Sequence, residues 1–207
     1  MKKMRLLLAL FLGVMVLFTS LGSYALSSEP VKATKKDTVY SNESFSVTIP
    51  KGWEGNDSQW SGPVARFHEM DIYNKFDEGA WVSIVRSSTK PFNWESPKQA
   101  AELSTALKEL PPDEALKYNI ELDPNYLGVF GEQDSIEIGG CPAYLTIYKY
   151  QADEDMLLDF QFCVITPWDN QLYYVNHNTY YSTMNMNPQI GDECYDIIES
   201  IRFKRKE

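Results

Sequence analysis

Apolar and polar residues alternate most strongly over residues 136–167, and this pattern predicts a β-hairpin at the centre of the chain, with a shorter strand just before it. Apolar side chains occupy every second position of both long runs: Ala143, Leu145 and Ile147 in the first, and Leu158, Phe160, Phe162 and Val164 in the second. Packing these faces together predicts three cross-strand pairs, Ile147 with Leu158, Leu145 with Phe160 and Ala143 with Phe162. A four-residue loop over residues 151–154 then joins the strands.

Further strands are predicted on both sides of the hairpin. Phe45, Val47 and Ile49 alternate with polar residues, and Pro50 with the Lys51–Gly52 turn ends that strand. A second pair of strands is predicted over residues 64–70 and 80–86, with residues 71–79 as their loop. The last strand is predicted over residues 171–181, after the turn that begins at Trp168.

Two helices are expected to cover the sheet. Ser96 is a capping residue, Pro97 stands at the first helical position and Gln99 follows, which together predict a helix start. Its apolar stripe is Ala100, Leu103, Leu107 and Leu110, and prolines 111 and 112 end it. Residues 112–118 add a helical turn, and residues 119–131 are a loop. The second helix starts at 187–188, with Ile190, Cys194, Ile197 and Ile201 on one side. The predicted class is α+β, an antiparallel sheet between helices.

The first 25 residues are typical of a secretory signal peptide. A charged start is followed by an apolar run, and Ser23 and Ala25 are small residues at the two positions that signal peptidase reads. Cleavage is predicted after Ala25, which leaves residues 26–37 as a flexible spacer and residues 38–207 as one domain. The alternative is an uncleaved chain that residues 6–26 anchor in the membrane, but the most apolar part is short for a bilayer.

The charge of the chain restricts the partners it can bind. The formal net charge is -10, and removing residues 1–25 removes three cations and no acid, which gives -13. A chain this acidic repels nucleic acid and anionic membrane surfaces, so neither is a predicted partner. Basic partners and divalent cations remain compatible with this charge.

Cys141, Cys163 and Cys194 all follow the predicted cleavage site. Secretion permits a disulfide, but an odd count leaves at least one thiol free. Cys141 lies on the core face of the predicted hairpin and Cys163 on the opposite face, which argues against a bond between them. A bond from Cys194 to either strand stays open, and three buried free thiols are the favoured state.

The order of these elements resembles the PsbP-like superfamily. The resemblance covers residues 38–202 and rests on SFSVTIPKGW, a mid-chain helix, IEIGGCPAY at the start of the hairpin, a Tyr-rich strand and a terminal helix ending in DIIESIRF. The superfamily is named for an extrinsic subunit of photosystem II. It also includes a nuclear import factor that binds the GTPase Ran and many secreted bacterial proteins. The resemblance implies an antiparallel sheet sandwiched between helices, an α/β/α sandwich, and transfers no catalytic or metal-binding residue.

The residues with catalytic or metal-binding chemistry are few. His68 and His177 are the histidines of the chain, and a metal site at His68, Glu69 and Asp71 is disfavoured because adjacent strand residues face opposite ways. No G-x-S-x-G elbow supports a hydrolase. An acidic group at the hairpin tip, Asp153, Glu154, Asp155 and Asp159, lacks the spacing of a calcium loop, so a solvated turn is favoured. No catalytic residue, metal or cofactor is predicted.

The Tyr/Asn-rich segment near the C-terminus is the predicted binding surface. Aromatic faces and carboxamides suit a protein partner or a sugar, although aromatic residues also fill strands simply as core. The predicted site residues are Tyr180, Tyr181, Asn176 and Asn178. The first hypothesis is a secreted, non-enzymatic module that binds a protein partner at the cell envelope. A glycan-binding or cell-wall-binding module that also uses exposed tryptophans such as Trp60 or Trp94 is the second, and a hydrolase with an unrecognised site is the third.

Overall fold

The computed structural model describes residues 36–56, 66–74, 77–87, 94–131 and 133–205. Eleven strands lie within these residues: β1 Thr38–Ser41, β2 Phe45–Ile49, β3 Trp53–Asn56, β4 Arg66–Asn74, β5 Asp77–Ser87, β6 Tyr126–Val129, β7 Asp134–Ile138, β8 Cys141–Ala152, β9 Asp155–Ile165, β10 Leu172–Tyr180 and β11 Arg202–Phe203. The helices of the described part are α2 Pro97–Lys108, α3 Pro112–Lys117, α4 Tyr181–Met186 and α5 Pro188–Ser200. The signal-peptide and anchor predictions lie outside the described residues, as does most of the spacer.

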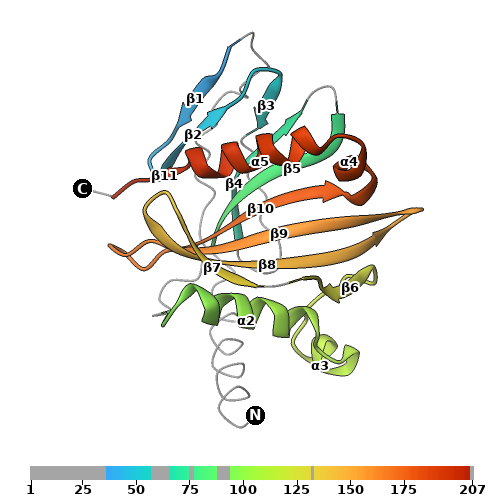
Figure 1. Cartoon of the computed structure of the whole chain (residues 1–207). Helices are drawn as coiled ribbons and strands as arrows, with labels where there is room; N and C mark the ends of the chain where they lie inside the picture. Colours follow the sequence, from blue (N-terminus) through green and yellow to red (C-terminus); the bar gives the residue numbers. More distant parts are fainter. Residues whose placement is uncertain (1–35, 57–65, 75–76, 88–93, 132, 206–207) are drawn as a thin grey trace.

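The strands form two antiparallel sheets. The larger has the order β3-β4-β5-β10-β9-β8-β6, with β7 also paired to β8, and the smaller has the order β1-β2-β11. Helix α5 and the small sheet lie on one side of the large sheet, and α2 lies on the other (Figure 1). The predicted fold class, an α+β antiparallel sheet between helices, is confirmed. No helix of the described part is long and apolar enough to cross a membrane.

Each face of the large sheet has its own core. On the α5 face, where α5 covers the sheet, Phe162, Val164 and Val175 pack with one side of α5: Ile190, Cys194, Ile197 and Ile198. On the α2 face, the buried side chains are Trp94, Ala100, Ala101, Tyr144, Cys163, Ile165, Leu172 and Tyr174. Apolar residues on both faces of β9 explain why its burial is nearly continuous toward its C-terminal end.

The central hairpin forms, but in a register two residues away from the predicted one. Leu145 pairs with Phe162 and Ile147 with Phe160, and pairing continues to Ala152 and Asp155, so the connection is a two-residue turn. Asp153 in this turn has a φ of 50°, a conformation that Asp tolerates better than most residues. Because a shift of two keeps every side chain on its face, Leu145 and Phe160 still pack against the same core.

Several other strands differ from their predicted bounds. Strands β4 and β5 extend through most of the predicted 71–79 loop, and β6 occupies residues predicted as loop. Strand β10 ends at Tyr180, and Tyr181 begins the unpredicted helix α4. Strands β4 and β5 pair with each other as far as Asn74 and Asp77, so the predicted loop is mostly paired strand, and β6 pairs with β8. Alternation within a single segment does not show which residues it pairs with.

The helices start where their sequence signals predict, but α2 ends at Lys108, so Leu110 of its predicted stripe lies beyond the helix. The Ser96 hydroxyl accepts a hydrogen bond from the Gln99 backbone N–H at 3.2 Å, so the predicted N-cap is confirmed. Residues 112–117 form the predicted short helix α3. Helix α5 buries its predicted stripe, while Arg202 donates to the backbone carbonyl of Glu199 at the helix end.

The cysteines are free and buried, as favoured from the sequence. Cys141 belongs to the core of the α5 face and Cys163 to that of the α2 face, which confirms that they point apart. Burial raises the pKa of Cys141 to about 11 and that of Cys194 to about 12, so their reactive thiolate forms are scarce near neutral pH.

We therefore expect the folded protein to react with an aromatic disulfide reagent far more slowly than the unfolded protein. Thiol titration should find three reactive thiols in denaturant and almost none under native conditions on the same timescale. A count of one in denaturant would instead indicate a disulfide and contradict this prediction.

Candidate functional site

The length of α2 leaves part of the large sheet open to solvent. Twelve helical residues span only about 18 Å at 1.5 Å per residue. The twelve residues of β8 span about 40 Å at 3.3 Å per residue. Helix α2 therefore covers the inner part of the β8–β9 hairpin and ends at Lys108, while the outer part of the hairpin continues beyond it.

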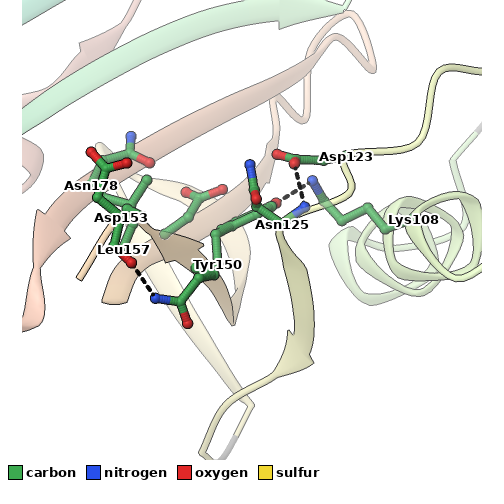
Figure 2. Close-up of a pocket in the computed structure, with 10 residues that line it drawn as sticks. Lys108, Asp123, Asn125, Tyr150, Asp153, Leu157 and Asn178 are labelled. Carbon is green, nitrogen blue, oxygen red and sulfur yellow. Dashed lines mark hydrogen bonds between the residues drawn. The ribbon is translucent and has the colours of Figure 1, made fainter. Parts of the chain in front are cut away.

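An open pocket of about 460 Å³, hereafter the hairpin pocket, lies at this position. It lies between the end of α2, the segment before β6, the β8–β9 hairpin and the last part of β10. Its lining residues are Lys108, Asp123, Asn125, Tyr150, Gln151, Ala152, Asp153, Leu157, Asp159 and Asn178. In Figure 2, Asn178, Asp153 and Leu157 group at one side of the view, and Asp123, Asn125 and Lys108 group at the other.

Lys108 is held in place by tyrosines. Its ammonium donates a hydrogen bond to the Tyr150 hydroxyl at 2.7 Å and lies 4.8 Å from the centre of the Tyr148 ring and 5.4 Å from that of Tyr150 (Figure 2). Burial, followed by the negative charge of Asp159, raises the pKa of Tyr150, and burial raises that of Tyr148 to about 12. Both phenols are therefore neutral at physiological pH, and the Lys108 ammonium is already engaged.

Asp159 and Asn178 lie side by side on neighbouring strands, because β9 pairs with β10 at this position. Asp159 is only 6% exposed, and one of its carboxylate oxygens accepts a hydrogen bond from the Asn176 carboxamide at 3.0 Å. Asn178 is 9% exposed and lines the pocket, yet its carboxamide has no hydrogen-bond partner within the described residues. Since buried carboxamides are normally satisfied, Asn178 presents an unused donor and acceptor to the pocket.

The rim of the pocket is fixed by backbone contacts. The Asp123 carboxylate accepts a hydrogen bond from the Asn125 N–H at 2.9 Å, and the Asn125 carbonyl accepts one from the Gln151 N–H at 2.8 Å. The Gln151 carboxamide donates to the carbonyls of Asp153 and Asp155 at 2.8 and 3.0 Å. These bonds join the segment before β6 to the hairpin tip, so the opening is defined before any ligand binds.

The structure brings together two of the four predicted site residues. Asn178 lines the pocket, and Asn176 positions Asp159 from beside it. Tyr180 instead packs edge-on against Trp81, with ring centres 6.4 Å apart, and Tyr181 is 41% exposed at the start of α4, outside the pocket. Tyr180 shares the β10 face of Asn176 and Asn178, whereas Tyr181 belongs to another element because the chain changes from strand to helix after Tyr180.

The tryptophan part of the glycan hypothesis is wrong for Trp94. This side chain is 9% exposed and packs in the core of the α2 face, so it offers no open ring to a sugar. Trp60 lies outside the described residues.

The remaining pocket residues were missed from the sequence. Asp159 was grouped with the hairpin tip, but it lies four positions inside β9 and is buried. A usable signal was present: Tyr148, Tyr150, Asp159 and Gln161 give the second face of the hairpin a polar and aromatic character. Such a face is unusual beneath a helix, where apolar residues normally pack.

The histidines lie apart from this pocket. His177 is buried on the α5 face, stacked on Phe160 with ring centres 5.1 Å apart, while His68 belongs to β4. Within the described residues no group of three or more His, Cys, Asp or Glu side chains is placed to hold a metal ion. Asp155, at the hairpin tip, binds Ser182 of α4 instead, and these hydrogen bonds lower its pKa.

Comparisons with known proteins agree with the fold. No family model matches the sequence, and no curated protein matches it by sequence. The solution structure of the cyanobacterial PsbP (CyanoP) from Synechocystis sp. PCC 6803 matches 89% of this chain and 99% of its own length, with a TM-score of 0.56 at 10% identity. LpqN of Mycobacterium tuberculosis, described as involved in cell envelope biogenesis, matches 82% of this chain and 91% of its own, with a TM-score of 0.45 at 12% identity. The chain has the PsbP-like fold.

Proposed function

We propose that this chain, which has the PsbP-like fold, is a secreted, non-enzymatic interaction module that binds a partner at the cell exterior through the hairpin pocket. The observation that carries the proposal is the Asn178 carboxamide, which is nine-tenths buried, faces the pocket and has no partner within the described residues. A concave, largely preformed opening with convergent polar groups is the first place to look for a binding site.

The chemistry of the pocket supports binding more than catalysis. Its lining contains carboxylates, carboxamides, one phenol and one ammonium, and no histidine, cysteine or serine is among the described residues that line it. A hydrolase needs a nucleophile within hydrogen-bond reach of a base. His177, the histidine whose side chain the structure describes, contacts Phe160 and Tyr195 on the opposite face of the sheet.

Filling the mouth of the pocket should abolish partner binding. Asn125 is exposed on the rim and its hydrogen bonds there use the backbone, so Asn125→Trp adds a bulky side chain without removing them. We expect at least about a tenfold loss of the crosslinked partner in affinity capture from native envelope extracts.

Asn185→Trp is the matched control. Asn185 is exposed on α4, outside the pocket, so the same added ring should leave capture at the wild-type level. Equal capture by both variants would show that the partner binds elsewhere, and the proposed role of the pocket would then be wrong.

A glycan ligand is the second candidate. A carboxylate beside a carboxamide, as Asp159 lies beside Asn178, is able to bind a pair of sugar hydroxyls. Retention of the wild-type protein on purified wall polysaccharide, and its loss with Asn125→Trp, would support this candidate over a protein partner.

Export is the part of the proposal that the leader sequence supports. We expect the mature protein recovered from the cell exterior to begin at residue 26, because residues 1–25 have the charged, apolar and small-residue regions that signal peptidase recognises. Intact mass spectrometry measures this directly. A mass that retains residues 1–25 would favour the membrane-anchored alternative.

A further inference from the structure

We propose that the hairpin pocket takes an organic cation, an ammonium or guanidinium group, held between the floor residues Asp159 and Asn178 and the rim carboxylates of Asp123 and Asp153. This inference rests on the proposed binding function and adds the chemical class of the ligand. The same group occurs in a free amine and in a Lys or Arg side chain of a protein partner.

The charge around the pocket favours a cation. Three carboxylates line it, from Asp123, Asp153 and Asp159, against one ammonium, from Lys108. That ammonium donates to Tyr150 and lies over two tyrosine rings, so its own contacts partly occupy it. The carboxylates would repel an anion, whereas they would attract a cation.

The floor of the pocket offers acceptors to such a group. Asn178 is nine-tenths buried, has no hydrogen-bond partner within the described residues and presents its carboxamide oxygen as an acceptor. Asp159 lies directly opposite it on β9, and its carboxylate is oriented by the Asn176 carboxamide. An N–H group that donates to both would satisfy the carboxamide and place its positive charge against a carboxylate that solvent barely reaches.

The spacing of the acids distinguishes an organic cation from a metal ion. Within the described residues, which include the whole pocket lining, no three acidic, histidine or cysteine side chains converge closely enough to hold a metal ion. A metal ion needs its oxygen ligands within about 2.0 to 2.6 Å. The N–H groups of a guanidinium are spread over a plane, and they are able to contact carboxylates that stand apart.

The test is a titration of the isotope-labelled protein followed by backbone amide NMR shifts. Agmatine is the free cation, an acetylated and amidated Ala-Arg-Ala peptide is the side-chain form, and the matching Ala-Gln-Ala peptide is the uncharged control. We expect agmatine, the arginine peptide or both to shift amides around the pocket, such as those of Asn125, Gln151 and Asn178, and the glutamine peptide to shift none. Tighter binding of the peptide indicates a protein partner, and tighter binding of agmatine indicates a small molecule.

Asp159→Asn removes the buried charge at nearly constant volume and should weaken cation binding by at least about tenfold. Because Asp159 is buried and this variant could lose its fold, Asp153→Asn serves as a second variant. Asp153 is exposed in a left-handed turn that Asn also adopts, and its loss should weaken binding about two- to threefold. Asp192→Asn, exposed on α5, is the charge-matched control and should change nothing.

The proposal is overturned if neither cation shifts pocket amides at millimolar concentration, or if the Asp153 and Asp159 variants bind as the wild type does. A neutral disaccharide that shifts the same amides while the cations do not would overturn the cation assignment and leave the pocket as a binding site. A separate experiment tests the binding function itself. If Asn125→Trp does not reduce partner capture, the pocket is not the binding site.

Discussion

Replacing Gly139 by alanine is expected to lower the free energy of unfolding by about 3 kcal/mol, the sum of a left-handed backbone penalty and an overpacking cost. Gly139 has a φ of 59° in the β7–β8 turn, and a Cβ there would lie 2.6 Å from the backbone oxygen of Ile201. That oxygen belongs to the junction between α5 and β11, where no flexible side chain is available to move aside. The substitution would therefore separate the turn from the C-terminal segment.

Gly140→Ala is the matched control for this prediction. Gly140 also has a positive φ, 79°, but its added Cβ would meet nothing within 4 Å. We expect it to cost only about 1 kcal/mol, from the backbone conformation alone. Chemical denaturation of both variants measures the difference, which isolates the contact with Ile201. Equal losses would mean that the turn does not approach that carbonyl in solution.

The free energy of unfolding is also expected to fall by about 3 kcal/mol as the pH decreases from about 6.5 to about 4, because of His177. Its side chain is only 2% exposed, and neither ring nitrogen has a hydrogen-bond partner in the described structure. Phe160 stacks on the ring, and Tyr195, the titratable side chain in ring contact with it, lies edge-on at 5.8 Å. Burial in this aromatic site lowers the pKa of His177 from 6.5 to about 4.

The direction of this change in stability with pH follows from proton binding. Between these two pH values the unfolded chain binds a proton at His177 and the folded chain does not, so protonation favours unfolding. The stability contributed by the neutral ring is complete above pH 6.5, declines steadily as the pH falls below 6.5, and is lost once the pH has fallen through 4.

His177→Phe keeps a ring between Phe160 and Tyr195 and removes both unpartnered nitrogens. Denaturation curves at several pH values should show a shallower decline for this variant than for the wild type across the window. Its stability at neutral pH should be similar or higher, because an unsatisfied buried polar group costs about 1 to 3 kcal/mol. If the free energy of unfolding of both proteins fell equally across this pH window, His177 would not be the cause of the decline.

The sequence predicted those parts of the fold for which one short segment carries the whole signal. Alternation identified the hairpin and its faces, and Ser96 with Pro97 located the start of α2. The register was wrong by two residues, because side-chain faces repeat every two positions and cannot distinguish registers that differ by two. The turn fixes the register, because Asp153 takes a left-handed conformation that allows pairing to continue to Ala152.

The sequence predicted only part of the candidate site. Asn178 was among the predicted residues, but its neighbours in the pocket come from α2, the segment before β6, β8 and β9. Lys108 and Asp159 are separated by fifty-one positions, and no local pattern connects them. Tyr180 and Tyr181, adjacent in sequence, were predicted to act together and belong to different elements.

The sequence by itself determined the fold class, the two faces of the hairpin, the starts of the main helices and the burial of the cysteines, because each depends on residues close together in the chain. Only the tertiary structure decided the hairpin register, the buried position of His177 and the hairpin pocket. Helix α2 ends before the hairpin does, and a difference in length between two packed elements becomes visible only when they are placed against each other.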